Sequence, residues 1–350
     1  MGRSGLFTMM IDTYNRPSLL RAAVSAALRQ TYDHVELILV NNGATPETID
    51  YLHEVAASDP RVKLVHFTEN QYSWDDPTKM LDACLNAALK VATGEYVWYQ
   101  ADDDLIADDY AEKMVALFRG RPECTTAAGL PVSIDIHGQV IEGPRVSNLR
   151  PRYMPGHELA LGVVRGEHRL FSAPGTIFTI KREVLVRSGG YHRALELSHL
   201  YGIVPFGVTG FDETALFYWR RHEGQINRRL AAEGWVGLRE SLSLLRDWEI
   251  ERRWQEFGAA IAREAVDSVE RQLCATAAKW CVANACCLRL KGAFRIFHDA
   301  WRHPKFWQQL PGSIRQWSGH VVTRCRNIAI AVSLRLSGVR RTTSVAKSHE

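Results

Sequence analysis

Apolar and polar positions form alternating blocks along the first hundred residues. Four apolar runs rich in branched side chains lie at residues 6–11, 35–40, 62–66 and 95–99. Helical patterns separate these runs, and each run has the length and composition of a buried strand. Pro17 and Pro46 stand where two of the helices would begin, a position that suits proline because the first helical N–H has no partner there. Strand and helix in turn predict a parallel sheet covered by helices.

The pattern changes further along the chain. Residues 120–230 mix short apolar runs with Gly and Pro, as expected for the second half of the same domain. From about residue 231, long helical patterns rich in Ala, Leu, Arg and Trp take over. We therefore expect an α/β domain over residues 1–230, with a mostly parallel sheet flanked by helices, and a basic, Trp-rich helical region over residues 231–350.

The composition is that of a folded chain, with 46% hydrophobic and 23% charged residues. This balance excludes disordered and fibrous proteins. No stretch approaches the roughly 18 uncharged apolar residues that a membrane-spanning helix needs. The seven cysteines are odd in number and lack the spacing of a metal-binding ladder, which favours reduced thiols. We expect a cytoplasmic chain.

Charge is distributed unevenly. Residues 271–350 contain 14 Lys and Arg against only Asp299 and Glu350, a net charge of +12, whereas residues 1–270 contain 29 against 37, a net charge of −8. The two regions should therefore have different roles.

Polar segments follow each of the four expected strands. They are Asp12–Arg16, Asn41–Gly43, Glu69–Asn70 and Asp102–Asp104. Because ligands of open α/β sheets bind beyond the carboxyl ends of the strands, these segments are expected to form one binding edge.

The three consecutive aspartates are the sharpest local signal. Closely packed carboxylates repel one another unless a hard cation shares them, and Mg²⁺ or Mn²⁺ is the usual resident when a diphosphate is nearby. The alternative is a solvated turn that caps the next helix. The position after a strand, on the edge that also holds Arg16, favours the metal site.

Several segments together resemble a family 2 glycosyltransferase with the GT-A fold. They are, in the family's order, Phe7–Pro17, Leu28–Tyr32, Val35–Gly43, Asn86, Ala92–Val97, Asp103-Asp104, Gly189–Tyr191 and Tyr218–His222. The resemblance covers roughly residues 5–227 and implies a nucleotide-sugar donor.

The resemblance also implies roles for single residues. Thr13, Tyr14 and Arg16 would lie along the nucleotide, and Asn41 and Asn42 near its base. Asp103 and Asp104 would hold the divalent ion, and Arg220 and His222 would lie near the donor pyrophosphate, where fixed cations stabilise a leaving group.

Two positions depart from the family pattern. Asn41 stands where the family usually has Asp, which alters base recognition but keeps hydrogen-bonding capacity. Ala101 stands where the first aspartate of Asp-x-Asp-Asp belongs. Either a ribose contact is missing or Asp102 supplies it.

The catalytic base is also assigned by the resemblance. Counting back from His222 places Glu196 on the second member of the family's Glu-Asp pair, although Leu195 occupies the first. Glu196 is therefore the candidate base. His199, one helical turn further along, is the rival, although a lone histidine often has a purely structural role.

The C-terminal region combines its positive charge with aromatic residues, namely Trp280, Trp301, Phe306, Trp307 and Trp317. Basic and aromatic residues together are typical of helices that lie on an anionic membrane surface, which we expect for residues 271–350. A plain helical bundle with Trp in its core is the alternative, and nucleic-acid binding is the least favoured one.

The favoured function is that of an inverting, metal-dependent glycosyltransferase of the hexosyltransferase type. It would move a sugar to a hydroxyl of a glycan or lipid-linked acceptor at the cytosolic face of a membrane, as in polysaccharide biosynthesis. Two alternatives stay open: a sugar nucleotidyltransferase, which lacks support from a Gly-rich phosphate loop, and a non-catalytic nucleotide-sugar-binding protein of the same fold.

Overall fold

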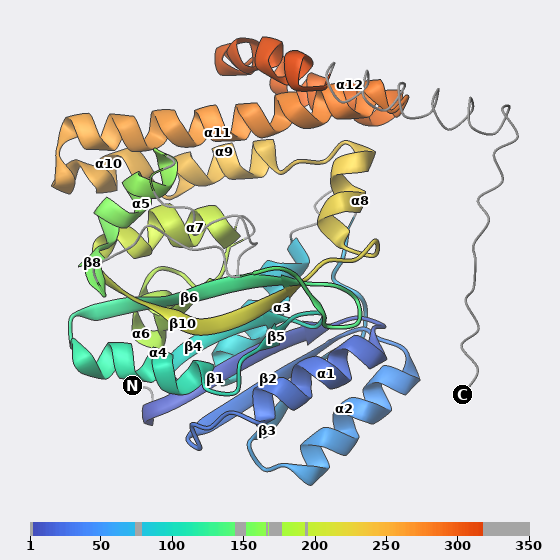
Figure 1. Ribbon diagram of the computed structural model, residues 1–350, viewed down its shortest axis with the longest axis vertical. Coiled ribbons are helices and arrows are strands. Elements are labelled where there is room, and N and C mark those ends of the chain that lie inside the picture. The colour runs from blue at the N-terminus through green and yellow to red at the C-terminus, as the bar shows by residue number, and fades with distance from the viewer. Residues whose placement is uncertain are drawn as a thin grey trace, which may run out of the picture. The chain divides into compact units, whose positions relative to one another are not determined.

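The computed structural model describes residues 3–73, 79–143, 152–165, 167, 177–192 and 195–317 (Figure 1). These residues divide into two compact units. Unit 1 comprises residues Met1–Gln225 and Arg239–Glu270, and unit 2 comprises Ile226–Leu238 and Arg271–Glu350, each within the described range. The domain boundary expected at residue 230 stays a prediction, because a compact unit in a structure is not necessarily a domain that folds by itself.

The first half of unit 1 alternates strands and helices. In order, its elements are β1 (Arg3–Thr13), α1 (Pro17–Leu28), β2 (Val35–Asn42), α2 (Pro46–Ser58), β3 (Val62–Phe67), α3 (Lys79–Val91), β4 (Gly94–Ala101), β5 (Leu105–Ile106) and α4 (Tyr110–Gly120). The four expected strands are confirmed, and each extends one to three residues beyond its apolar run. Pro17 and Pro46 open α1 and α2 as predicted.

The second half of unit 1 is more irregular. Its elements are β6 (Cys124–Ile134), β7 (Val140–Glu142), β8 (Tyr153–Pro155), α5 (Gly156–Val164), β9 (Phe178–Lys181), α6 (Arg182–Arg187), α7 (Leu195–Gly202), a 3₁₀ turn at Val204–Phe206 and β10 (Val208–Arg220). Further along, α9 (Leu238–Asp247), α10 (Ile250–Trp254) and a 3₁₀ turn at Gln255–Phe257 follow.

One mixed sheet joins the described strands in the order β3-β2-β1-β4-β9-β6-β10-β5, with β7 beside β6 and β8 beside β10. The long pairings, β3 with β2, β2 with β1, β1 with β4 and β6 with β10, are parallel, and the antiparallel pairings are short. All eight residues of β2 are buried, as expected for a parallel strand covered on both faces. The expected α/β class is confirmed.

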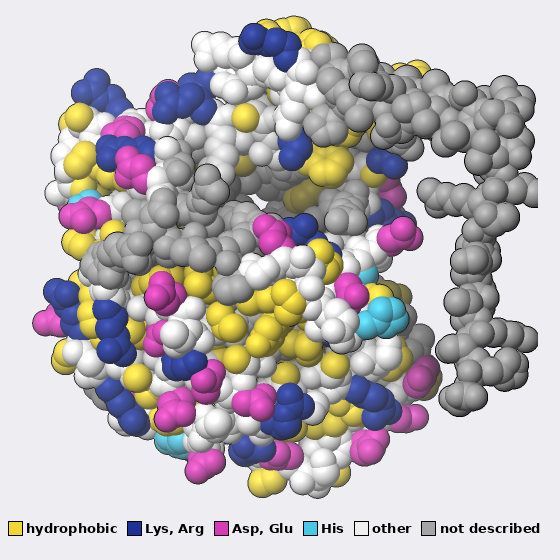
Figure 2. Space-filling model, viewed as in Figure 1, with side chains coloured by type: hydrophobic (Ala, Val, Ile, Leu, Met, Phe, Trp, Pro, Cys, Tyr) yellow, Lys and Arg dark blue, Asp and Glu magenta, His cyan; other side chains and the backbone are white. Residues whose placement is uncertain are grey.

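The crossover helices cover both faces of the sheet. The chain runs outward from β1 to β3 through α1 and α2, which lie on one face, and returns through α3 on the other to place β4 beside β1 (Figure 1). On the face that carries α1 and α2, Lys and Arg side chains are interspersed with Asp and Glu (Figure 2).

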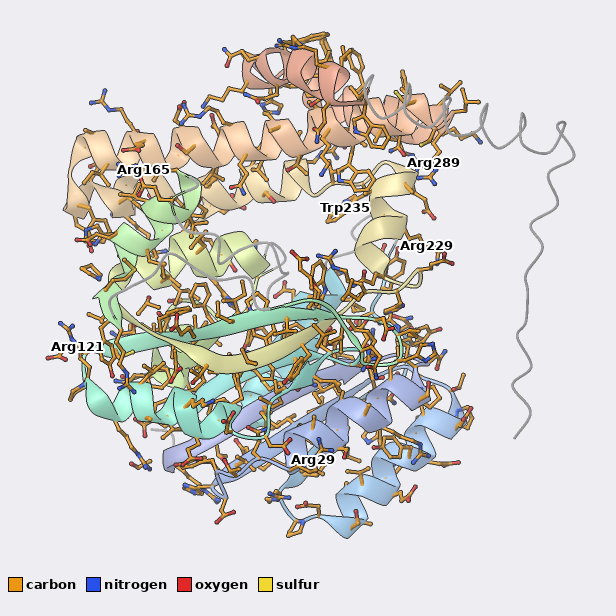
Figure 3. The ribbon with its side chains drawn as sticks, viewed as in Figure 1. Arg29, Arg121, Arg165, Arg229, Trp235 and Arg289 are labelled. Carbon is orange, nitrogen blue, oxygen red and sulfur yellow. The ribbon has the colours of Figure 1, made fainter. Side chains whose placement is uncertain are left out.

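Unit 2 is helical, as expected for the C-terminal region. It contains α8 (Ile226–Glu233), the second half of α11 (Ala259–Cys286), α12 (Leu290–Ala300) and a final helical stretch at residues 304–317. Residues 259–270 of α11 belong to unit 1, where Arg165, labelled in Figure 3, donates to both carboxylate oxygens of Glu264 at 2.7 and 2.8 Å. Within the described range, no helix is both long and apolar enough to cross a bilayer.

Candidate active site

The candidate site lies where the order of the sheet reverses. From β1 the chain turns to β2 on one side, while β4 lies on the other side of β1, with Asp12 and Ala101 paired at the last register position. Such a switch point leaves a crevice beyond the strand ends, because the loops leave in opposite directions. The segments after β1 and β4, residues 14–16 and 102–104, meet there.

Arg16 joins these two segments. Its Nη1 donates to Asp102 Oδ1 at 3.1 Å and to Asp103 Oδ2 at 2.9 Å, and Thr13 Oγ1 donates to Asp102 Oδ2 at 2.9 Å. The Arg16 side chain is 31% exposed, whereas the two carboxylates are about one-tenth exposed. Arg16 is therefore a partly accessible cation that covers buried carboxylates.

His222, two residues after the end of β10, reaches the same carboxylate. Its Nε2 lies 2.9 Å from Asp103 Oδ2, although the two residues are 119 positions apart in the sequence. Asp103 Oδ2 thus lies between Arg16 and His222.

Arg220 holds the aspartate segment in place from within the protein. Its Nε donates to the Asp103 carbonyl at 2.7 Å, its Nη1 to the carbonyls of Asp135 and Ile136 at 3.0 and 2.8 Å, and its backbone N–H to Asp104 Oδ1 at 2.9 Å. The residue is only 3% exposed. In this structure Arg220 is a positioning residue, and its expected contact with the donor diphosphate stays a prediction.

Burial raises the pKa values of several carboxyl groups in the site. Burial raises the pKa of Asp102 to about 7, against the opposing effect of Arg16. Burial, and then the neighbouring Asp103, raise the pKa of Asp104 well above its usual range. Burial also raises the pKa of Asp12. A bound cation would lower these pKa values, because a positive charge stabilises the carboxylate form.

The two asparagines after β2 shape the neighbouring loops. Asn42 is fully buried; its Nδ2 donates to Asn70 Oδ1 at 3.1 Å, and its Oδ1 accepts the Gln71 N–H at 2.8 Å. Asn41 Oδ1 accepts the Ala44 N–H at 2.8 Å, and its Nδ2 lies 3.3 Å from His66 Nδ1. Their expected role beside the base remains a prediction.

Gly43 and Tyr14 also belong to the polar segments of the expected binding edge. Gly43 has a φ of +67°, and a Cβ there would lie 2.4 Å from the Asn70 backbone nitrogen, so only glycine fits. Tyr14 is 43% exposed, which leaves its ring accessible to a ligand.

Asn86 was part of the family resemblance without an assigned role, and the structure supplies one. Its Oδ1 accepts the Tyr191 N–H at 2.8 Å and its Nδ2 donates to the Tyr191 carbonyl at 2.9 Å. A Cβ on Gly190, whose φ is +88°, would lie 2.3 Å from Asn86 Oδ1. Asn86 and the Gly-Gly-Tyr segment are therefore one structural feature, in which the Asn86 side chain fixes the backbone of Tyr191.

The two candidate bases are placed differently. Glu196 lies in α7, but its side chain falls outside the described part of the chain. His199 is 3% exposed and packs against the Tyr191 ring at a centroid distance of 5.5 Å. Burial lowers the pKa of His199 to about 3. A buried imidazole of such low basicity is poorly suited to take a proton from a bound acceptor.

The residues at the rim suit a divalent ion in part. Among the described side chains, no group of three or more His, Cys, Asp or Glu is placed to hold a metal ion. Mg²⁺ is usually bound through one or two carboxylates together with substrate phosphates and water. Arg16 and His222 contact Asp103 Oδ2, and the Arg220 N–H contacts Asp104 Oδ1, so these hydrogen bonds do not separate the two aspartates, and the metal-binding role of both stays a prediction.

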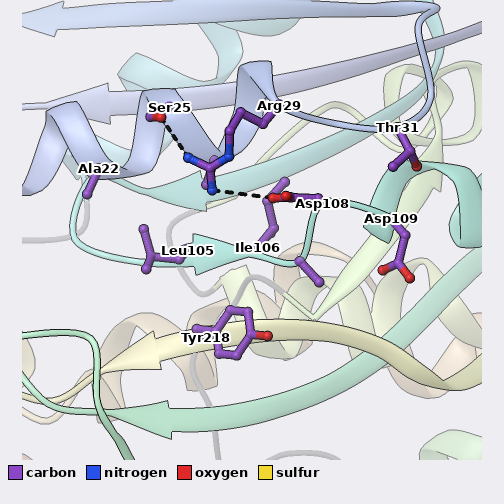
Figure 4. Close-up of a pocket in the computed structure, with 11 residues that line it drawn as sticks. Ala22, Ser25, Arg29, Thr31, Leu105, Ile106, Asp108, Asp109 and Tyr218 are labelled. Carbon is purple, nitrogen blue, oxygen red and sulfur yellow. Dashed lines mark hydrogen bonds and ion pairs between the residues drawn. The ribbon is translucent and has the colours of Figure 1, made fainter.

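A separate pocket of about 670 Å³ lies between α1 and the β5 segment (Figure 4). Its lining includes Arg29 Nη1 and Nη2, which donate to Ser25 Oγ at 2.8 Å and to Asp108 Oδ1 at 3.3 Å. Tyr218 also lines it. None of the expected donor-binding residues lines this pocket, so we do not assign it to the donor.

Comparison with known proteins agrees with this arrangement. The model of the Glycosyl transferase family 2 matches residues 8–137. An uncharacterized glycosyltransferase of Haemophilus influenzae is 32% identical over 110 residues, which is 31% of this chain and 41% of the relative. Putative glycosyltransferase EpsH of Bacillus subtilis is 32% identical over 108 residues, which is 31% of this chain and 29% of that protein. The matches thus span less than half the length of these relatives.

The fold is also found in a solved structure. Residues 1–349 of TarS from S. aureus, crystallised in complex with UDP-GlcNAc, align with a TM-score of 0.57 at 11% identity, covering 90% of this chain and 92% of that one. At this identity the likeness concerns the fold alone. The family-model match at residues 8–137 includes Arg16 and the three aspartates, whereas His222 and α7 lie beyond it.

Proposed function

Because the model of glycosyl transferase family 2 matches residues 8–137, we propose that this chain belongs to that family and transfers a sugar from a nucleotide-diphosphate-sugar to a hydroxyl of an acceptor. The observation that carries the proposal is the convergence of Arg16, Asp102, Asp103 and His222 at the switch point of the sheet. This edge combines buried carboxylates with a partly exposed cation, which suits a diphosphate and its metal ion.

The donor nucleotide would lie across the ends of β1 and β2. Tyr14 offers an exposed ring to the base or ribose, and Thr13 and Asp102 are hydrogen-bonded to each other at the adjacent edge. Arg16 would leave the carboxylates to pair with the diphosphate. Because TarS was crystallised with UDP-GlcNAc, UDP-sugars are the first donors to test.

The divalent ion, Mn²⁺ or Mg²⁺, would be held by Asp103 with His222 beside it. When bound, it supplies charge neutralisation for the departing diphosphate. Arg220 supports this by fixing the Asp103 carbonyl and the Asp104 side chain.

The reaction would be a single inverting displacement by a hexosyltransferase. Glu196 takes the proton of the acceptor hydroxyl while the acceptor oxygen attacks the anomeric carbon. The low basicity and burial of His199 favour Glu196 in this role.

The acceptor would be a glycan or a lipid-linked saccharide at an anionic membrane surface, as in polysaccharide biosynthesis. The strongly basic region over residues 271–350 supports this assignment, since it would keep the chain beside such an acceptor.

A donor screen followed by product analysis tests the proposal. Stabilisation by a ligand grows with its concentration over Kd, by ~2.7 kcal/mol at a hundredfold excess. One nucleotide-sugar should therefore raise Tm, more strongly with Mn²⁺ than without it. With that donor radiolabelled in the sugar, release of nucleoside diphosphate and a product of inverted anomeric configuration are expected. Release of pyrophosphate would identify a nucleotidyltransferase instead, and binding without turnover with any glycan acceptor would identify a binding protein.

A further inference from the structure

Helix α12 presents a continuous apolar row to solvent. Leu290, Phe294, Phe297 and Trp301 follow one another at spacings of four, three and four residues, so they share one face of the helix. They are 66, 67, 37 and 43% exposed. Single exposed apolar residues are ordinary, but a contiguous row of large ones indicates an interaction surface.

The opposite side of α12 is fixed, so the row cannot turn inward. Gly292, Ile296 and Ala300 are buried, and a Cβ on Gly292 would lie 2.7 Å from the Ala232 carbonyl oxygen. Asn284 Nδ2 donates to the Ala231 carbonyl at 2.8 Å, which ties α11 to α8 at the same place. Within unit 2, α12 thus has one apolar face that packs and a second one that does not.

A basic row runs beside the apolar one. Lys291, Arg295, His298 and Arg302 each follow a member of the apolar row by one residue, and all four are exposed. The Arg302 guanidinium lies over the Trp301 ring at 5.1 Å. Residues 288–317 contain six Lys and Arg against Asp299 alone.

The turn before α12 adds a further apolar residue at an unfavourable position. Leu288 is 83% exposed and has a φ of +59°. Its N–H donates to the Ala285 carbonyl at 3.1 Å, and the Arg289 N–H donates to the Asn284 carbonyl at 2.8 Å. This is a Schellman motif whose left-handed position normally holds Gly or Asn. A leucine at this position favours neither the left-handed backbone conformation nor the contact of the turn with water.

We propose that α12 and the preceding turn bind flat on an anionic lipid bilayer, with the apolar row in the headgroup boundary and the basic row on the lipid phosphates. Interfacial helices combine these two rows in this way, with long basic side chains reaching the headgroups and Trp at the boundary. The charge of the α12 surface distinguishes between two kinds of partner. A purely apolar face would suit another protein, whereas an apolar row beside a basic row suits an anionic surface. This inference rests on the proposed function, because the membrane would carry the acceptor. Its test requires neither the donor nor sugar transfer.

The test is sedimentation of the full chain with vesicles of phosphatidylcholine alone or mixed with phosphatidylglycerol. The wild type should bind the anionic vesicles and bind zwitterionic ones far less. Leu290→Ser with Phe294→Ser should weaken binding at least tenfold, because two exposed apolar side chains lose their burial. Lys291→Gln with Arg302→Gln should weaken it about thirtyfold at low salt, from ~1 kcal/mol per basic residue, and much less at high salt. Val186→Ser, a 49% exposed residue of α6 in unit 1, is the matched control and should change nothing.

Leu288→Asn separates a binding role from a structural one. Asn accepts the left-handed conformation more readily than leucine, so Tm should hold or rise while vesicle binding falls. Equal binding of the wild type and the Leu290→Ser, Phe294→Ser variant would overturn the proposal. So would a dimer that forms without lipid and is lost in that variant, or capture by RNA in preference to anionic vesicles.

Discussion

The two ends of the central sheet treat buried carboxylates in opposite ways. At the amino ends of the strands, Glu36 accepts hydrogen bonds from Thr8 Oγ1 at 2.6 Å, Lys63 Nζ at 2.6 Å, the Thr93 N–H and Oγ1 at 2.6 and 2.8 Å and the Gly94 N–H at 2.9 Å. Burial opposes ionisation, but these donors outweigh it and lower the pKa of Glu36 to about 2.

At the carboxyl ends, three consecutive aspartates have fewer donors than they have oxygens. Burial raises the pKa of Asp102 to about 7 and that of Asp104 well above its usual range. A carboxylate whose negative charge is stabilised by surrounding hydrogen-bond donors contributes to the stability of the fold. Carboxylates whose charge is not balanced in this way are suited to bind a ligand that brings a cation. The same residue chemistry is therefore structural at one edge and available for function at the other.

The largest expected effect comes from the carboxyl end. Asp103→Asn should lower the rate of transfer at least about a thousandfold, because loss of the metal removes several kcal/mol of charge stabilisation, and it should leave Tm nearly unchanged. Titration calorimetry with a nucleoside diphosphate should show that Mn²⁺ no longer tightens binding. Asp108→Asn, whose side chain is 55% exposed in a surface ion pair with Arg29, is the control. Unchanged Mn²⁺ dependence in Asp103→Asn would remove this residue from the site.

Glu196 tests whether the chemistry at this end includes the acceptor proton. Glu196→Gln should lower kcat by ~10²–10⁴-fold, while the donor Kd and its metal dependence remain near those of the wild type, because a base acts on the acceptor alone. His199→Ala should lower Tm, since it empties a buried position, and affect kcat much less. Full activity in Glu196→Gln together with an inactive His199→Ala would transfer the role to His199.

Glu36 tests the amino end. The pKa of Glu36 is lower in the folded chain than in the unfolded one, so its contribution of about 3 kcal/mol is present above pH ~4.5 and is lost as pH falls towards 2. Glu36→Gln should lower stability at neutral pH and flatten the loss of stability between pH 4.5 and 2, measured by urea unfolding. Donor affinity should stay the same. Glu47→Gln, an exposed residue of α2, should match the wild type, and a fall in donor affinity in Glu36→Gln would contradict the division between the two ends.

The substitution of Asn86 is expected to have the smallest effect. It concerns both the stability of the fold and the activity. Asn86→Ala removes the side-chain partner of both backbone groups of Tyr191; since these contacts are only part-buried, the cost is roughly 1–3 kcal/mol in total. A lower Tm is expected, with a modest fall in kcat because the Gly-Gly-Tyr segment loses its anchor. Lys90→Ala on the exposed side of α3 is the control. An unchanged Tm in Asn86→Ala would mean that water replaces the side chain without loss.

The elements of the first hundred residues could be predicted because their signals are local. A branched apolar run of five residues and a proline at a first turn depend on a few neighbours only. The same holds for the position of the polar segments at one edge of the sheet, since they follow the strands directly; their role in binding stays a prediction.

The roles of single side chains could not be predicted in the same way. Arg220 and His222 are neighbours in one basic run, yet Arg220 is buried against carbonyls and His222 reaches Asp103. Asn42 shows the same limit, because its buried side chain bonds to the Asn70 side chain and the Gln71 N–H. Such differences depend on contacts between residues far apart in the chain. The charge and Trp content of the C-terminal region indicated a surface role, but the choice between the two apolar faces of α12 depended on Gly292.

The contacts of the aspartate segment with Arg220 of β10 and with His222 just after it limit how this chain can be recombined. The family match ends at residue 137, so a chimera joined there would look natural from the sequence. However, β10 pairs with β6 along nine register positions and supplies Arg220 to the aspartate segment, and the residues directly after β10 supply His222. A segment that ends at residue 137 would lack β7, β8, β9 and β10, four of the ten strands of the described sheet. An exchange after Gln225 would keep Asp103, Arg220 and His222 from one parent, but residues 239–270 of unit 1 would then come from the other.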